Sequence, residues 1–261
     1  MKFFARLRYI YRFRGLIYSF VARDLKTRYR GSALGFLWSF LDPLINSAVL
    51  WAVYTFIFAK GIPNLPLFLI SGVISWNFFG GTIAGSTLSV VSNGNLLKKI
   101  RLPREVFPIA TMLANLVHYT LAFLVLIIVV VITHPPFNPV AWLFIPIVVA
   151  LIALVALGFG LTLSAISVYF RDTPHITDSV LRIWYFMTPI FYQVSAVPKR
   201  YLNVYLLNPG ASGVTALREI VLNGRIPEPK LFLFLGGAAV ILMVIGMSTF
   251  SRLEKGFADE V

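Results

Sequence analysis

Six long apolar stretches, separated by turns that carry most of the charge, constrain this chain more than any other feature. Four of them contain no Asp, Glu, Lys or Arg, and the other two contain one and two such residues. Each is long enough to cross the hydrocarbon core of a bilayer, which requires about 20 residues in a helix. The stretches are residues 34–59, 67–91, 107–133, 140–170, 173–197 and 231–251. The sequence therefore predicts an all-α polytopic membrane protein with six transmembrane helices.

The composition agrees with this class and excludes others. Charged residues make up 13% of the chain and the mean hydropathy is +0.83, whereas soluble domains contain about 25% charged residues. The absence of cysteine excludes disulfides, thiolate metal sites and cysteine nucleophiles. A net charge of +13 would suggest nucleic acid in a soluble protein. Here topology and contact with anionic headgroups explain it, so no nucleic-acid partner is expected.

The distribution of Lys and Arg predicts the orientation. If the N-terminus is cytoplasmic, most of the 23 basic residues fall on the cytoplasmic side of the membrane. Cytoplasmic loops of membrane proteins carry such an excess of positive charge. We therefore expect both termini in the cytoplasm. The expected organisation is a cytoplasmic amphipathic segment over residues 1–33, a transmembrane domain over residues 34–252 and a cytoplasmic tail over residues 253–261.

Residues 15–30 are predicted to form an amphipathic helix on the membrane surface. Apolar side chains recur there at helical spacing, while Arg23, Lys26 and Arg30 share the opposite face. A helix of this kind places its cations toward the lipid headgroups. The pattern leaves two roles open, a topology anchor and a docking surface for a partner.

Residues 95–108 (NLLKKIRLPREVFP) connect the second and third stretches on the cytoplasmic side. Their beginning predicts a short amphipathic helix over about residues 95–102. Its apolar face consists of Leu96, Leu97 and Ile100, and its basic face of Lys98, Lys99 and Arg101. Pro103 suits the first turn of the next helix, and Glu105 lies favourably near the positive N-terminus of that helix. The alternative is an ordinary basic loop.

Residues 193–230 lie outside the membrane by the charge distribution, yet they contain an apolar run. That run is broken at Asn208, Pro209 and Gly210, and Arg218 and Glu219 follow. Backbone without hydrogen-bond partners cannot face lipid, so such a segment must pack against protein or line a cavity. We predict a re-entrant helical hairpin, and the alternative is a surface loop lying on the bilayer.

Few ionisable groups fall inside the predicted spans. Asp42 precedes Pro43 in the first span, and His118 is alone in the third. A carboxylate inside a membrane is a candidate functional group by default. Pro43, however, leaves a backbone carbonyl without its partner and kinks the helix, which favours a structural role for this pair. His118 is interpreted as a residue of a helix–helix contact.

Motifs for catalysis and nucleotide binding are missing. Gly80 and Gly85 have the spacing of a phosphate-binding loop, but Ser86 and Thr87 follow Gly85 where the Lys-Ser/Thr of Gly-Lys-Ser/Thr is required. The sequence contains no HExxH, no GxSxG and no paired catalytic carboxylates. We therefore predict no catalytic residue, no metal site and no nucleotide-binding site in this chain.

Four segments together resemble a known family. They are RDLKTRYRGSALGFLWSFLDPL at residues 23–44, KIRLPREVFP at 99–108, YFRD at 169–172, and LNP at 207–209 followed by LRE at 217–219. In this order and spacing they resemble the membrane subunits of type-2 ABC exporters for polysaccharides. That family includes exporters of O-antigen, capsule and wall teichoic acid. The resemblance covers nearly the whole chain, and Gly210–Gly213 departs from the bulkier residues that the family often has after Asn-Pro.

The resemblance implies a half-transporter of six spans that pairs with a second copy of itself and with two separate ATPase subunits. ATP and Mg would bind those partners, so no cofactor is expected here. Residues 96–101 would belong to the coupling helix that receives the ATPase motion. Residues 193–230 would form gate helices near the external mouth, with Asn208, Pro209, Arg218 and Glu219. At the cytoplasmic entrance, Arg23, Lys26, Arg28 and Arg30 would attract a substrate diphosphate or contact lipid headgroups.

These expectations describe a permease subunit in a bacterial plasma membrane. It would export a polysaccharide or teichoic acid linked to polyprenyl diphosphate, driven by ATP hydrolysis on its partner. One alternative is a membrane-embedded glycosyl- or acyltransferase of cell-envelope synthesis. That enzyme would need an acid/base pair or metal-binding carboxylates, and Asp42, Glu105, Asp172 and Asp178 form no such motif. A second alternative is a channel or carrier that does not use ATP.

Overall fold

The computed structural model describes residues 3–28, 30–58, 62–98 and 102–257. Within these ranges the regular structure is entirely helical, which confirms the predicted all-α class. Five helical segments are long and apolar enough to cross a membrane. They are Gly35–Phe56, Leu65–Ser89, Val106–Thr133, Pro139–Tyr169 and Pro229–Gly256.

The α-helices follow one another with short turns between them. In chain order they are α1 (Phe3–Tyr11), α2 (Arg14–Arg28), α3 (Trp38–Val53), α4 (Leu65–Ser89), α5 (Gly94–Leu97), α6 (Val106–Thr133), α7 (Pro139–Trp142), α8 (Ile145–Tyr169), α9 (Thr173–Met187), α10 (Leu202–Leu206), α11 (Pro209–Val221) and α12 (Pro229–Leu253). A 3₁₀ turn at Gly35–Leu37 precedes α3, and a π-helical segment at Tyr54–Phe58 follows it.

Five of the six apolar stretches correspond to the long helical segments, and their ends lie within a few residues of the predicted ones. The stretch over residues 173–197 differs, because only its first part is helical. There α9 ends at Met187 after 15 residues, or about 22 Å of rise. Thr188 is extended because the ring of Pro189 disfavours a helical conformation in the preceding residue. The count of six spans therefore remains a prediction.

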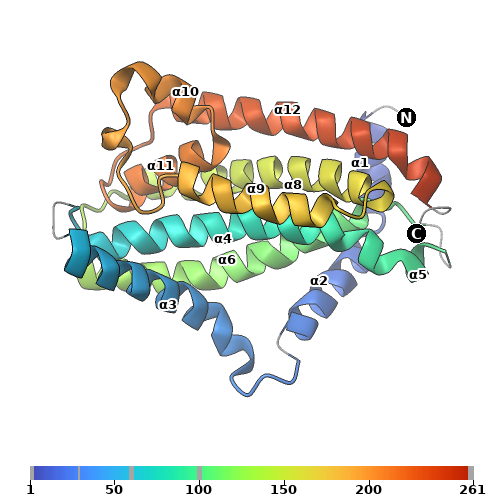
Figure 1. Cartoon of the computed structure of the whole chain (residues 1–261), viewed down its shortest axis with the longest axis horizontal. Coiled ribbons are helices and arrows are strands. Elements are labelled where there is room, and N and C mark those ends of the chain that lie inside the picture. Colours follow the sequence, from blue (N-terminus) through green and yellow to red (C-terminus); the bar gives the residue numbers. More distant parts are fainter. Residues whose placement is uncertain (1–2, 29, 59–61, 99–101, 258–261) are drawn as a thin grey trace.

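The helix α4 lies at the centre of the bundle (Figure 1) and packs against α3, α6, α8, α9 and α11. In the most apolar window of α4, 83% of the residues are buried, compared with 17–44% in the other four long segments. Close packing also joins α8 to α12. A Cβ added at Gly246 would lie 2.6 Å from the carbonyl oxygen of Gly158. Small residues thus set the short helix–helix distances of the core.

The two ends of the bundle differ in what they carry (Figure 1). At one end lie α1, α5 and the C-terminal end of α12, and at the opposite end lie α10 and α11. This arrangement groups the segments predicted to be cytoplasmic and separates them from residues 193–230. Between α2 and α3 the chain leaves the bundle and returns, so these two helices diverge from each other (Figure 1). Which end faces the cytoplasm remains a prediction.

Candidate functional site

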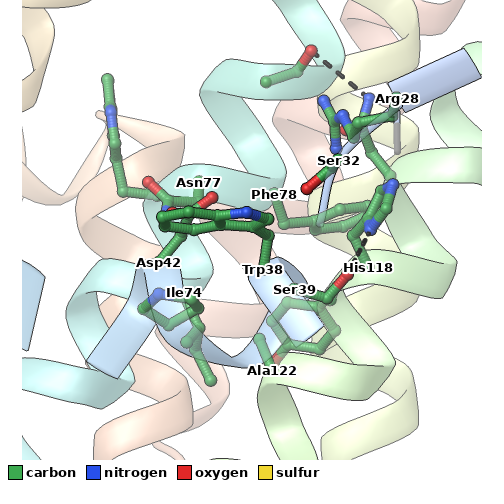
Figure 2. A pocket seen from close by; sticks show the side chains of 15 residues that line it. Arg28, Ser32, Trp38, Ser39, Asp42, Ile74, Asn77, Phe78, His118 and Ala122 are labelled. Carbon is green, nitrogen blue, oxygen red and sulfur yellow. Dashed lines mark hydrogen bonds between the residues drawn. The ribbon is translucent and has the colours of Figure 1, made fainter. Parts of the chain in front are cut away.

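Three cavities surround the middle of α4. The first has a volume of about 640 Å³ and lies between α3, α4 and α6. Figure 2 shows Arg28 and His118 toward one end of it and Asp42 and Asn77 toward the other. It is lined by Arg28, Ser32, Trp38, Ser39, Asp42, Pro43, Ile74, Trp76, Asn77, Phe78, Gly81, Asn115, His118, Tyr119 and Ala122. A cavity with a guanidinium, a carboxylate, amides and indoles can hold a polar ligand at the depth of the spans.

One of the predicted intramembrane residues, His118, joins α6 to α3 at this cavity. The Nδ1 atom of His118 lies 3.2 Å from the Oγ atom of Ser39. Pro43 is buried in α3, whereas the carboxylate of Asp42 is exposed on the cavity wall. His118 therefore makes the expected helix contact and also lines the cavity. The sequence favours a structural role for Asp42 together with Pro43, but the position of Asp42 also allows its carboxylate to contact a ligand in this cavity.

The second cavity, of about 440 Å³, extends the first toward α2. The two share Arg28, Gly81, Asn115 and His118, so they lie next to each other. Arg23 lines its α2 end, where its guanidinium donates a 2.9 Å hydrogen bond to the side-chain oxygen of Asn93. We call these two adjoining cavities together the entrance groove.

Two of the four cations predicted for the cytoplasmic entrance line this groove. Arg23 and Arg28 contribute to its walls, whereas Lys26 and Arg30, both exposed and both within the described residues, line neither cavity. For Lys26 the helical period explains the difference, because α2 packs only one face against α6. Arg30 lies beyond the end of α2.

The third cavity, of about 650 Å³, lies on the other side of α4, toward α9. It shares Trp76, Asn77 and Gly81 with the first cavity. From α9 it receives both charged residues of the fifth apolar stretch, Asp178 and Arg182. Charged groups in such a helix are expected to face a cavity rather than lipid. Gly81 lines all three cavities.

Several lining residues were not predicted from the sequence. Asn77 and Asn115 are amides within stretches that carry no charge, and both line the entrance groove. Asn77 is exposed although most of α4 is buried. The sequence alone could have indicated both residues, since an amide inside an apolar span needs a hydrogen-bond partner or a cavity. A prediction based only on ionisable groups inside the spans therefore misses these two amides.

At the opposite end of the bundle, Asn208 starts α11 and connects it to α9. Its Oδ1 atom accepts hydrogen bonds from the amide of Gly210 at 3.0 Å and from Nε1 of Trp184 at 2.7 Å. Pro209 occupies the first turn, where its missing N–H costs no helical hydrogen bond. The predicted break at Asn-Pro is thus a helix start with a side-chain cap.

Arg218 lies fully inside the protein and binds backbone from two other segments. Its guanidinium donates hydrogen bonds to the carbonyl oxygens of Pro189, Ile190 and Phe68, the last two at 2.7 and 2.9 Å. Its carbon Cζ lies 3.5 Å from the centroid of the Phe68 ring. Arg218 therefore joins α11 to the start of α4 and to the turn after α9. Glu219 and Arg218 both line a cavity of about 320 Å³ at this end of the bundle.

The small residues after Asn-Pro, where the chain departs from the family pattern, allow α11 to pack closely. A Cβ added at Gly213 would lie 2.8 Å from the side chain of Ile152 in α8. One added at Gly210 would lie 3.0 Å from the Oγ1 atom of Thr188. The departure therefore leaves α11 helical and buries it deeply among α4, α8 and α12.

The predicted coupling segment is only partly within the described residues. Leu97, at the end of α5, is buried, Leu96 is half-buried against the same apolar cluster, and Lys98 is exposed. This agrees with one apolar and one basic face. Lys99, Ile100 and Arg101 lie outside the described residues. Among the residues that the structure describes, no cluster of His, Cys, Asp and Glu could hold a metal ion.

The fold and these cavities define a polytopic α-helical membrane protein with a polar groove between its spans. Residues 15–222 match the family described as ABC-2 type transporter, and the chain belongs to this family. It is 32% identical, over 257 residues and 98% of each chain, to the O-antigen export system permease protein RfbA of Myxococcus xanthus. RfbA of Klebsiella pneumoniae is 28% identical over 239 residues and 91% of each chain.

A third relative, the polysialic acid transport protein KpsM of Escherichia coli, is 25% identical over 239 residues, or 89% of this chain and 91% of the relative. The resemblance seen in the four sequence segments is therefore confirmed as a family relationship.

Proposed function

We propose that this chain is the permease subunit of an ATP-driven exporter in a bacterial plasma membrane. Its substrate is a polysaccharide linked to polyprenyl diphosphate, which it moves from the cytoplasm to the outer face. The names of the relatives, which refer to O-antigen export and polysialic acid transport, support the substrate class. Two copies of the chain and two ATPase subunits make up the complete exporter, and ATP and Mg bind the ATPases.

The observation that carries the proposal is the entrance groove, because its lining suits both parts of such a substrate. Arg23 and Arg28 stand where α2 meets the bundle, and a guanidinium binds phosphate oxygens in a bidentate geometry. Deeper in the groove the amide of Asn77 can exchange hydrogen bonds with sugar hydroxyls. Asn115 can offer its Oδ1 atom as an acceptor, because its nitrogen donates to the carbonyls of Gly81 and Thr111. The headgroup thus meets cations first and the sugars meet amides and indoles beyond them.

A second copy of the chain completes the path in this proposal. The cavity between α4 and α9 carries Asp178 and Arg182 and is open on one side. On α9, Ile176, Val180 and Ile183 form an exposed apolar stripe at helical spacing. A partner copy would enclose the charged groups of this cavity, and the apolar stripe of α9 would contact either the partner copy or lipid. The sugars then pass between two α4 helices.

The test compares two glycines in helix interiors. Gly81 lines all three cavities, so Gly81→Trp adds bulk where it narrows the proposed path. Gly236 in α12 has no atom within 4 Å of an added Cβ, so Gly236→Trp adds the same bulk outside the path. In a strain lacking the native gene, surface polysaccharide is measured for both variants, together with their membrane level and their copurification with the ATPase.

We expect Gly81→Trp to abolish surface polysaccharide while the variant still inserts and binds the ATPase. Gly236→Trp should export normally. Export at the wild-type level by Gly81→Trp would refute the assignment of the path. Failure of the wild-type chain to copurify with any ATPase would refute the function itself.

A further inference from the structure

Arg6 joins three helices at the end of the bundle that carries α1 and α5. From α1 its Nε atom donates a hydrogen bond to Oε1 of Glu105, the residue that precedes α6. Its Nη2 atom donates another to Oε2 of Glu254, the residue that follows α12. One guanidinium thus holds two carboxylates from segments about 150 residues apart in the sequence.

Arg6 provides the charge that compensates a deeply buried carboxylate. The side chain of Glu105 is 1% exposed, and within the described residues its second oxygen has no hydrogen-bond partner. Burial disfavours the charged form of Arg6, but the two carboxylates outweigh this effect and raise its pKa above the usual range. The arginine therefore stays charged. Removing it would leave the Glu105 carboxylate buried and unpaired, which is far costlier than losing a surface pair.

The same helices share one apolar cluster around this ion triad. Ile10 of α1, Leu97 of α5, Phe107 of α6 and Phe250 of α12 are all buried in it. In addition, the hydroxyl of Tyr169 donates a 2.8 Å hydrogen bond to the carbonyl of Leu253. The ion triad therefore lies beside an apolar cluster, here called the packed layer, that also contains Leu97 of the predicted coupling segment.

We propose that Arg6 is a positioning residue that transmits displacement of this layer to α6 and α12. The proposal rests on the proposed function, because an ATPase must supply the displacement. Arginine suits the task because its planar fork offers two nitrogens to two different carboxylates at once. Lysine carries its charge on a single nitrogen and can pair well with only one of the two carboxylates at a time.

The experiment uses the complete exporter in proteoliposomes, with Arg6→Gln, Arg6→Lys and a control on the same helix, Arg8→Gln. Arg8 is exposed and lies two residues away. Polysaccharide export and ATPase activity with and without substrate are measured. Because the chain has no cysteine, spin labels on Arg12→Cys and Arg252→Cys report the distance between the turn directly after α1 and helix α12 in each background.

In Arg6→Gln we expect export to fall by roughly 5- to 150-fold, the usual size of a coupling between two sites. ATPase activity without substrate, assembly with the ATPase and the membrane level should stay normal. The distribution of spin-label distances should broaden. Arg6→Lys should be intermediate in both measurements, and Arg8→Gln should match the wild type.

Wild-type export together with an unchanged distance distribution in Arg6→Gln would overturn the proposal. If Arg6→Gln does not accumulate, Glu254→Gln removes the half of the triad that is more exposed and leaves Glu105 paired. It should show the same separation of export from ATPase activity, and wild-type behaviour would again be decisive. A wild-type exporter that moves no polysaccharide would refute the proposed function, while the spin-label distances would still decide the role of Arg6.

Discussion

Replacing Gly72 by alanine should destabilise the protein, although alanine is the better helix former. Gly72 lies in α4 beneath the side chain of Arg218. An added Cβ would lie 2.6 Å from the Nη2 atom of Arg218 and 3.0 Å from the carbonyl oxygen of Ile190. Real Cβ atoms do not approach neighbours to 2.6 Å. The guanidinium must therefore move, together with the hydrogen bonds that it makes.

The magnitude follows from the atoms that must move. The Nη2 atom donates to Phe68 and Ile190, so a shift weakens two charge-assisted hydrogen bonds. Overpacking a tight core costs about 1–3 kcal/mol. At Gly237 in α12 an added Cβ meets no atom within 4 Å. There Gly237→Ala should gain up to about 1 kcal/mol from helix propensity. Gly72→Ala gains the same helix propensity, so the two variants should differ in stability by the overpacking cost alone, about 1–3 kcal/mol.

The assay is equilibrium unfolding in mixed micelles by titration with an anionic detergent, followed by tryptophan fluorescence. The pair Gly72→Ala and Arg218→Met is then combined in a double-mutant cycle. If the clash with the guanidinium causes the cost, Gly72→Ala should lose less stability when Arg218 is already Met. An equal loss in both backgrounds would refute the reasoning. Gly72→Ala that is as stable as Gly237→Ala would refute it as well.

Three further predictions follow from the sequence and the site. The purified chain should neither bind nor hydrolyse ATP, and saturable micromolar binding measured by equilibrium dialysis would contradict this. Charge reversal at Lys98, Lys99 and Arg101 should uncouple ATPase activity from export without affecting insertion, whereas normal export would make the segment an ordinary basic turn. Single cysteines over residues 204–221 should react periodically with an external, impermeant thiol reagent and change when the ATPase is trapped with ATP. Uniform labelling independent of nucleotide would indicate a passive surface loop.

The long spans could be predicted because a single property determines them. A helix that faces lipid or other helices excludes charge along its whole length, so a run without Asp, Glu, Lys or Arg marks it directly. The helices α4, α6 and α12 begin and end within a few residues of those runs. The end of α9 at Met187 was not predicted, because Pro189 lies inside an apolar stretch that hydropathy alone treats as continuous.

The candidate site was less predictable because it depends on which helix faces meet. Arg23 and Arg28 line the entrance groove while Lys26 does not, and only the packing of α2 against α6 separates them. Asn77 gives no charge signal, and its importance follows from its exposure on an otherwise buried helix. The role of Arg6 depends on Glu105 and Glu254, which are far away in the sequence.

The small residues of α4 connect the rigidity of the bundle to its cavities. At Gly72 the absence of a side chain lets Arg218 cross to the start of α4 and fix α11 against it. More than two turns further along, Gly81 also lacks a side chain, and it lines a cavity on each side of the helix. A larger residue would fill the cavities at Gly81, and at Gly72 it would weaken the contact between α4 and α11. A glycine in α4 can therefore allow close packing or leave a cavity, depending on the helix beside it. At Gly72 the guanidinium of Arg218 from α11 fills the space, whereas at Gly81 cavities remain beside α3 and α9.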